Sequence, residues 1–276
     1  MRVSFLRKYY PLLSSTKKNK KWRQITNYEL FNAIQEKQKL CNCFSVATKY
    51  SLYYSTVGKE ILRSRIFVDR NNNSLEPSYK IILSPNGKDE IYRINESEYS
   101  GKYFRLFTKY NEHPPFSGFY LDSLCRNLNT AIDIAITKMI KKHPNQKDWY
   151  TRLYGFTNKK CEFNKPSRAF EWFTGIKPIQ YGEEGYKSNL IKYKNDVVNL
   201  LKKMSVVSKE NYSFVLVSGA KKTSKVYKWH CMPIIKVNFR NKTVRFYDPR
   251  ERKTFEESFY SIIEKYKAIV GIFWDE

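Results

Sequence analysis

Three residues of the sequence have the side chains that a cysteine nucleophile and its activating base require. Cys43 stands at the expected start of an apolar segment, His230 lies inside the apolar run 229–235, and Asp248 follows the next apolar run. A carboxylate on one imidazole nitrogen fixes the tautomer and stabilises the imidazolium, which leaves the other nitrogen to take a proton from a thiol. The free N–H groups and the dipole at a helix start also favour thiolate over thiol. The set therefore predicts nucleophilic catalysis by Cys43, with His230 as base and Asp248 as the carboxylate that orients it.

Catalysis of this kind also needs hydrogen-bond donors for the oxyanion that forms on the attacked carbonyl. Gln38 lies five residues before Cys43 and is the candidate for a side-chain amide donor, with the Cys43 backbone N–H as the second donor. Gln35 is the alternative for the same role. Each residue of the set also has a structural interpretation: an inert buried thiol, a histidine that packs within a strand, and an aspartate that ends a strand before Pro249.

The other residues with possible site chemistry do not form a second pattern. His113 and His143 each precede a proline in polar surroundings, where an idle exposed imidazole is expected. The five cysteines have no paired spacing, so we expect neither a disulfide framework nor a zinc site, and the odd set favours a reducing environment. The segment that starts at Asp69 begins like a calcium-binding loop, but Ser74 and Lys80 replace its glycine and its glutamate. The sequence has no glycine-rich phosphate-binding motif, so we expect no metal, nucleotide or other cofactor.

Hydrophobic periodicity predicts the helices and strands that position these residues. The segment from Cys43 has helical spacing up to about Ser55, with Asn42 as its N-cap, and helical stripes recur at 128–140 and 189–204. Strands are expected at 65–69, 79–83, 90–94, 214–218, 229–237, 243–247 and 268–273, with a Pro-Asn-Gly turn at 85–87 and a hairpin connection at 239–242. Because antiparallel neighbours lie within hydrogen-bond reach, this last hairpin brings His230 and Asp248 together.

The order of these elements indicates an α+β fold, with a largely helical first half and a predominantly β second half. We expect a helical lobe that carries the nucleophile helix, packed against an antiparallel β lobe that carries His230 and Asp248. Residues 1–30 are basic and weakly patterned, and they are expected to form an N-terminal arm. Residues 31–276 contain no long linker and are expected to form a single bilobed domain.

Length and composition are those of a globular protein. The chain has 276 residues and a mass of 33.0 kDa, and 41% of its residues are hydrophobic, which excludes a disordered or repetitive chain. No apolar stretch approaches the about 20 residues of a membrane span, and charges interrupt the N-terminal stretch where a secretory signal would lie. The net charge is +25, but most of the excess is lysine spread over every segment. We therefore expect general attraction to anionic surfaces rather than a dedicated nucleic-acid site.

The chain order of the three residues resembles that of papain-like cysteine peptidases. In that superfamily a cysteine at a helix start precedes a histidine on a late strand and then an Asn or Asp at the end of the next strand. The calpain-type branch is the more similar one, on the segments 38–44 (QKLCNCF), 84–97, 149–155, 170–175 (FEWFTG), 229–233 (WHCMP) and 247–250 (YDPR). The likeness covers residues 35–274, with departures: C-N-C-F stands for G-D-C-W, Gln38 lies one residue closer to the cysteine, and Asp248 replaces an Asn. The Asp-Pro pair is similar to a second group, the bacterial effector peptidases with a Cys-His-Asp triad.

The resemblance implies a thiol hydrolase that cleaves a peptide or isopeptide bond of a protein substrate, through a triad of Cys43, His230 and Asp248 and the Gln38 amide. Water or an amine can resolve the acyl-enzyme, so deamidation or transglutamination of a protein glutamine is an alternative. A non-enzymatic basic adaptor that binds nucleic acid or anionic membrane is a further alternative, in which Cys43 and His230 are core residues. The expected location is the cytoplasm, or a host cell into which a specialised system secretes a bacterial effector.

Overall fold

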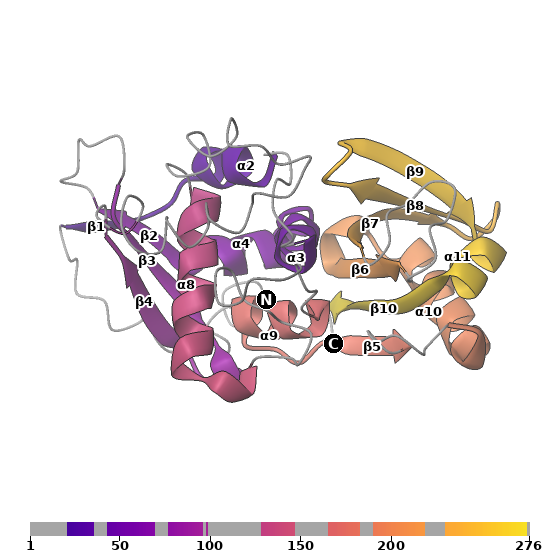
Figure 1. Cartoon of the computed structure of the whole chain (residues 1–276). Helices are drawn as coiled ribbons and strands as arrows, with labels where there is room; N and C mark the ends of the chain where they lie inside the picture. The colour runs from indigo at the N-terminus through magenta and orange to yellow at the C-terminus, as the bar shows by residue number, and fades with distance from the viewer. Residues whose placement is uncertain are drawn as a thin grey trace.

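The computed structural model of the chain describes residues 21–35, 43–69, 77–95, 98, 128–146, 165–182, 190–218 and 230–274. Within these ranges the fold is α+β, as expected, with two antiparallel sheets and seven α-helices. Figure 1 shows the smaller and the larger sheet at opposite sides of the molecule, with helix α3 between them. Over the same ranges, no helix combines the length and the apolar character that crossing a membrane requires.

The smaller sheet has four strands that follow one another in chain order. They are β1 (Trp22–Gln24), β2 (Ile66–Asp69), β3 (Tyr79–Leu83) and β4 (Glu90–Ile94). Buried and half-buried residues alternate along β2 and β3, which is the pattern of strands with one face on the core. The helices that share this core with the sheet include α2 (Asn27–Gln35), α4 (Thr56–Ser64) and α8 (Leu128–Lys142). The turn between β3 and β4 requires left-handed backbone at Asn86 and Gly87, whose φ values are 55° and 72°.

The larger sheet has six strands in the order β5-β10-β6-β7-β8-β9, all antiparallel. They are β5 (Ile179–Gly182), β6 (Tyr212–Ser218), β7 (Cys231–Asn238), β8 (Thr243–Asp248), β9 (Lys253–Ser258) and β10 (Tyr266–Phe273). All seven residues of β6 are buried, because the centre of the sheet is covered on both faces. Val215 belongs to the core that includes α3, whereas Phe214 belongs to a second core with α10 (Lys194–Val206) and α11 (Phe259–Lys265).

Helix α3 (Cys43–Tyr53) is the central element of the fold, and its first ten residues are all buried. It packs against α9 (Pro166–Thr174) and against strands β6 and β7 of the larger sheet. A surface helix keeps one polar face in water, so a helix buried on all sides is one around which the rest of the molecule is assembled. The packing therefore holds α3 in place between the two sheets (Figure 1).

Serine side chains fasten α3 to strand β6. Ser51 Oγ donates to the carbonyl of Phe214 (3.1 Å), and Ser213 Oγ donates to the carbonyl of Ser51 (3.1 Å). Ser55, just after α3, forms a hydrogen bond with Ser213 through the two hydroxyls (2.9 Å). These bonds satisfy polar groups that are buried between helix and sheet, so they fix the position of α3 along the strand.

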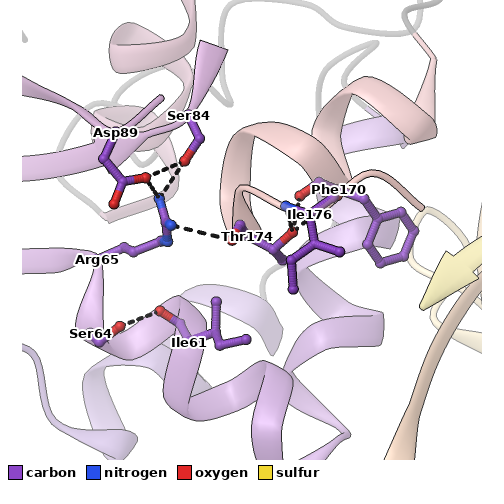
Figure 2. Close-up of polar contacts among 8 residues, drawn as sticks. All are labelled: Ile61, Ser64, Arg65, Ser84, Asp89, Phe170, Thr174 and Ile176. Carbon is purple, nitrogen blue, oxygen red and sulfur yellow. Dashed lines mark hydrogen bonds and ion pairs between the residues drawn. The ribbon is translucent and has the colours of Figure 1, made fainter. Parts of the chain in front are cut away.

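A buried arginine joins the smaller sheet to α9 (Figure 2). Arg65 donates from Nη1 to Ser84 Oγ (2.7 Å) and forms an ion pair with Asp89 (2.9 Å). Its Nη2 donates to the carbonyl of Thr174 at the end of α9 (3.3 Å). Ser84 in turn donates to Asp89. Because Arg65 is only 3% exposed, the free energy of its buried charge depends on these partners.

Arg65→Met is expected to lower the free energy of unfolding by about 3–5 kcal/mol, because it leaves the mostly buried Asp89 carboxylate without its counterion. Arg63→Met is the matched control, since Arg63 pairs with Glu60 between partly exposed side chains on α4 (2.6 Å). That loss should be below about 1 kcal/mol. Urea unfolding followed by circular dichroism measures both variants. Equal losses would contradict the role given to Arg65.

The element predictions are largely confirmed. Helix α3 begins at Cys43 as expected, α8 covers the expected 128–140, and β3 and β4 have the expected bounds. The strands expected at 229–237 and 243–247 are β7 and β8, with small shifts at their ends. The helix expected at 189–204 is divided, because residues 190–193 form a 3-10 turn before α10.

One expectation about the first part of the chain is wrong, and another is incomplete. Residues 22–30 are not part of a basic arm, because β1 pairs with β2 and both Ile25 and Leu30 are buried. The first lobe has more residues in helices than in strands, as expected, but β1 and the three expected strands pair there into a four-stranded sheet. The sequence does not indicate β1, because a strand of three residues is too short to show a period, and only its partner makes it a strand.

Candidate active site

Cys43 is the first residue of α3, at the end of the helix where backbone N–H groups lack intrahelical partners and the dipole is positive. The residue is 5% exposed and belongs to the core that α3 shares with the larger sheet. Asn42, the expected N-cap, lies outside the described residues. The helix start thus places the Cys43 sulfur at the junction with β7, where a thiolate is favoured.

His230 is fixed immediately before β7 by both of its backbone groups. Its N–H donates to Ser218 Oγ (2.8 Å), and its carbonyl accepts from the Ser218 N–H (2.8 Å). Ser218 is the last residue of β6, so His230 continues the pairing of β6 with β7. The backbone therefore positions this buried imidazole before any side-chain contact is made.

Asp248, the last residue of β8, holds the imidazole. Its Oδ1 lies 2.8 Å from His230 Nε2 and also accepts hydrogen bonds from the backbone N–H groups of Arg250 (2.8 Å) and Glu251 (3.2 Å). The turn that follows β8 therefore orients the carboxylate, as short polar side chains do when they bond to their own backbone a few residues on. Since β7 and β8 are paired neighbours, the structure brings His230 and Asp248 together across the hairpin.

The sulfur of Cys43 forms hydrogen bonds with the His230 side chain and with the thiol and the backbone N–H of Cys231. Because Asp248 engages Nε2 of His230, Nδ1 is the ring nitrogen that faces the thiol. The described residues thus place the thiol, the imidazole and the carboxylate in one continuous row. Cys231, the first residue of β7, lies beside that row.

Hydrogen bonds and charge stabilise the ionised form of each group in the row. The hydrogen bond from the Cys231 thiol, helped by the bond and the charge of His230, holds the pKa of Cys43 below its ordinary value although burial acts the other way. Burial acts to lower the pKa of His230, but hydrogen bonds with Asp248 and Cys43 raise it above its ordinary value. Burial acts to raise the pKa of Asp248, and His230 lowers it. At neutral pH the row is therefore a thiolate, an imidazolium and a carboxylate.

Stacked tyrosines join α3 to the strand that carries Asp248. Tyr50 lies seven residues after Cys43, two turns along the same face of the helix. Its ring stacks on that of Tyr247, the residue before Asp248, with 4.5 Å between the ring centroids. Tyr50 also stacks on Tyr54 at 4.6 Å. This aromatic contact sets the spacing between the helix with the thiol and the strand with the carboxylate.

The two glutamines expected as oxyanion donors are both beyond the side chains that the structure describes. Gln38 lies outside the described residues, and Gln35 is described only as the last backbone position of α2. The amide assignment therefore stays a prediction for both. His113 and most of the segment after Asp69 also lie outside the described residues.

His143 differs from its sequence-based expectation, because its imidazole is not idle. Its Nε2 lies 2.9 Å from Oε1 of Glu90, so the side chain after α8 is paired with the start of β4. The pair belongs to the smaller sheet and is not part of the row at the start of α3. It could not be predicted because the two residues are far apart in the sequence, by 53 positions.

Cys231 is the site residue that sequence reasoning missed, since the five cysteines were examined for paired spacing and Cys231 was assigned no role beside His230. Neighbouring residues in a regular strand point to opposite faces, which argues against joint contact with one partner. His230, however, precedes the strand, so both its side chain and that of Cys231 contact Cys43. The sequence signal that could have indicated this role is that Cys231 directly follows His230 in the chain.

Comparison with known proteins gives no family assignment: no protein-family model matches the chain, and no curated protein matches its sequence. Within the part of the chain that the structure describes, no group of three metal-ligating side chains is found. The function must therefore be argued from the chemistry of the site itself.

Proposed function

We propose that the chain is a cysteine-dependent hydrolase of papain-like fold, in which Cys43 attacks the carbonyl of a peptide or isopeptide bond in a protein substrate. The observation that carries the proposal is the place of His230, whose Nε2 lies 2.8 Å from Asp248 and whose ring also contacts Cys43. A cysteine with a purely structural role needs neither a base nor a carboxylate that orients the base. The order of the three groups is that of an activated nucleophile.

In the proposed reaction the Cys43 thiolate attacks the carbonyl carbon, and an electron pair moves to the carbonyl oxygen. The imidazolium of His230 then gives its proton to the leaving amine, which leaves an acyl-enzyme on Cys43. Neutral His230 takes a proton from water, and the water attacks the thioester and frees the thiolate. Asp248 stabilises the imidazolium throughout. The backbone N–H of Cys43, at the helix start, is one candidate oxyanion donor, and Gln38 is the expected second.

The substrate class in this proposal comes from the resemblance to the calpain-type branch, with the bacterial Cys-His-Asp effector peptidases as the second choice. The same steps release ammonia from a glutamine side chain in a deamidase, and transfer the acyl group to an amine in a transglutaminase. The same proposal includes the location of the protein, which is either the cytoplasm or a host cell into which it is delivered as an effector. The products identify the reaction, and the covalent intermediate identifies the nucleophile.

Active-site probes test the proposal directly. Electrophile-bearing peptides and a ubiquitin bearing an electrophile at its C-terminus are incubated with the wild type and with Cys43→Ala, and the adducts are weighed by mass spectrometry. We expect an adduct on the wild type that maps to Cys43 and is missing in the variant. Which probe reacts separates a peptide-bond from an isopeptide-bond preference. An adduct of equal yield on Cys43→Ala would refute the assignment of the nucleophile.

Cys43 is expected to react with iodoacetamide at least about tenfold faster than any other cysteine, because the thiolate is the nucleophile. Brief labelling at neutral pH followed by peptide mass mapping measures each site separately. Cys231 is an internal control, because it is also buried and is the residue that follows His230 in the chain. His230→Ala should reduce the advantage of Cys43. Equal labelling of all five cysteines would count against an activated thiol.

A further inference from the structure

Among the described residues, two thiols meet at the start of α3. Cys231 is fully buried, and both its thiol and its backbone N–H form hydrogen bonds with the sulfur of Cys43. Both cysteines are reduced in the structure. The hydrolytic steps derived above use Cys43, His230 and Asp248, and they assign no reaction to the Cys231 sulfur. The proposed hydrolysis therefore does not explain why a second sulfur contacts the nucleophile.

We propose that Cys231 is the resolving cysteine of a reversible redox switch, which forms a disulfide with Cys43 when the protein meets a peroxide. The inference rests on the proposed function only for its effect on activity, because the cross-link itself depends on the two thiols alone. The two sulfurs are on different elements, α3 and β7, which pack against each other in the same core. The partner thiol is thus already in place when Cys43 is oxidised.

The chemistry balances in two steps. The Cys43 thiolate attacks one oxygen of hydrogen peroxide, the O–O bond breaks, and Cys43 sulfenic acid and hydroxide are formed. The Cys231 sulfur then attacks the sulfenic sulfur, an S–S bond forms, and the oxygen leaves with the Cys231 proton as water. A dithiol reductant then reduces the disulfide between Cys43 and Cys231 back to two thiols. The peroxide is the oxidant, and it accepts the two electrons that the two sulfurs lose.

The disulfide would protect Cys43 from further oxidation and would also inhibit turnover. A sulfenic acid without a neighbouring thiol is oxidised further to sulfinic acid, which ordinary thiol reductants do not reverse. With Cys231 in hydrogen-bond contact, the sulfenic acid is captured before a second peroxide reacts. The disulfide also removes the nucleophile, so turnover stops until the thiols are restored. Such transient disulfides are the kind that a reducing compartment allows.

The test compares the wild type with Cys231→Ser, which keeps a hydrogen-bond donor next to Cys43 but cannot form the disulfide. Each protein is treated with hydrogen peroxide, divided, and incubated with or without dithiothreitol. Peptide mapping then records the state of Cys43, and turnover is compared with the untreated rate of the same protein. Cys231→Ala is the second variant, and thermal unfolding checks that both variants fold.

In the wild type we expect a cross-linked peptide that joins Cys43 to Cys231, and recovery of most of the activity with dithiothreitol. In Cys231→Ser, Cys43 should reach the sulfinic acid, and recovery should stay below about a tenth of the untreated rate. Equal sulfinic acid at Cys43 in both proteins, a Cys43 that peroxide leaves unchanged, or cross-links to other cysteines would each overturn the switch. Absence of turnover in every untreated protein would refute the hydrolase function and leave the cross-link measurable.

Discussion

Cys43→Ala should reduce turnover at least about ten-thousandfold while the protein remains folded. The sulfur is the only group in the proposed mechanism that bonds to the substrate, so no other side chain can replace it. Alanine is small and favours helices, so α3 can still form and pack in the core it shares with the larger sheet. The measurement is kcat/KM on the substrate that the probes identify, with the melting temperature determined in parallel.

Ser45→Ala is the matched control on the same helix. Ser45 lies two residues further along α3, is fully buried, and its hydroxyl has no hydrogen-bond partner among the described residues. Its removal changes the packing of α3 by one atom, as Cys43→Ala does, without touching the row of reactive groups. Turnover should be within about twofold of the wild type. Retained activity in Cys43→Ala, or an equal loss in Ser45→Ala, would show that the sulfur is not the nucleophile.

The sequence was sufficient for the parts of the site that depend on local pattern. The apolar spacing after Cys43 predicted where α3 begins, and alternation before and after residues 239–242 predicted the hairpin that joins His230 to Asp248. Both features can be predicted from hydrophobic periodicity, which depends only on residues close together in the chain. The contact of the thiol with the imidazole is of another kind, because it depends on how α3 packs against β7. It was expected from the types of the three residues and from the chain order of the family that they resemble, not from any local pattern.

The features that sequence reasoning missed depend on contacts that exist only in the folded chain. Helix α4 contains Gly58, which lowers helix propensity, yet a side chain there would collide with Ser55 Oγ and with the carbonyl of Leu52. Strand β9 has a single buried residue, so its sequence has little of the alternation that marks a strand. The charge of Arg65 would place it on a surface, and only its partners from two other elements make its burial possible. The partners of Arg65 lie 19 and 109 positions away, and the contacts of Gly58 with its near neighbours form only in the turn between α3 and α4.

The pH dependence of turnover is expected to be bell-shaped, since activity needs the thiolate of Cys43 and the imidazolium of His230 together. The pKa of Cys43 is lowered to about 5 and that of His230 is raised to about 9. As the pH falls through the lower value the thiolate is protonated, and as it rises through the upper value the imidazolium is lost. Turnover should therefore be highest between these limits. A single ionisation near neutral pH would contradict the charge pair.

Asp248→Asn should move the alkaline limb of this profile to lower pH and leave the acid limb nearly unchanged. The amide oxygen can still accept from His230 Nε2, but the negative charge that helps to raise the pKa of His230 is lost. The new NH2 group would replace Oδ2, which is buried without a partner among the described residues, so some stability is also lost.

Asp248→Ala removes the acceptor as well as the charge, and its turnover should fall by at least about a hundredfold, because the imidazole loses its orientation. Glu256→Gln is the matched control for charge, since it removes one carboxylate from the neighbouring strand β9, where Glu256 pairs with the exposed Arg245. Rates measured between pH 4 and 11 for the three variants separate charge from orientation. If Asp248→Asn leaves the alkaline limb in place, or Glu256→Gln moves it equally, the carboxylate of Asp248 does not act through His230.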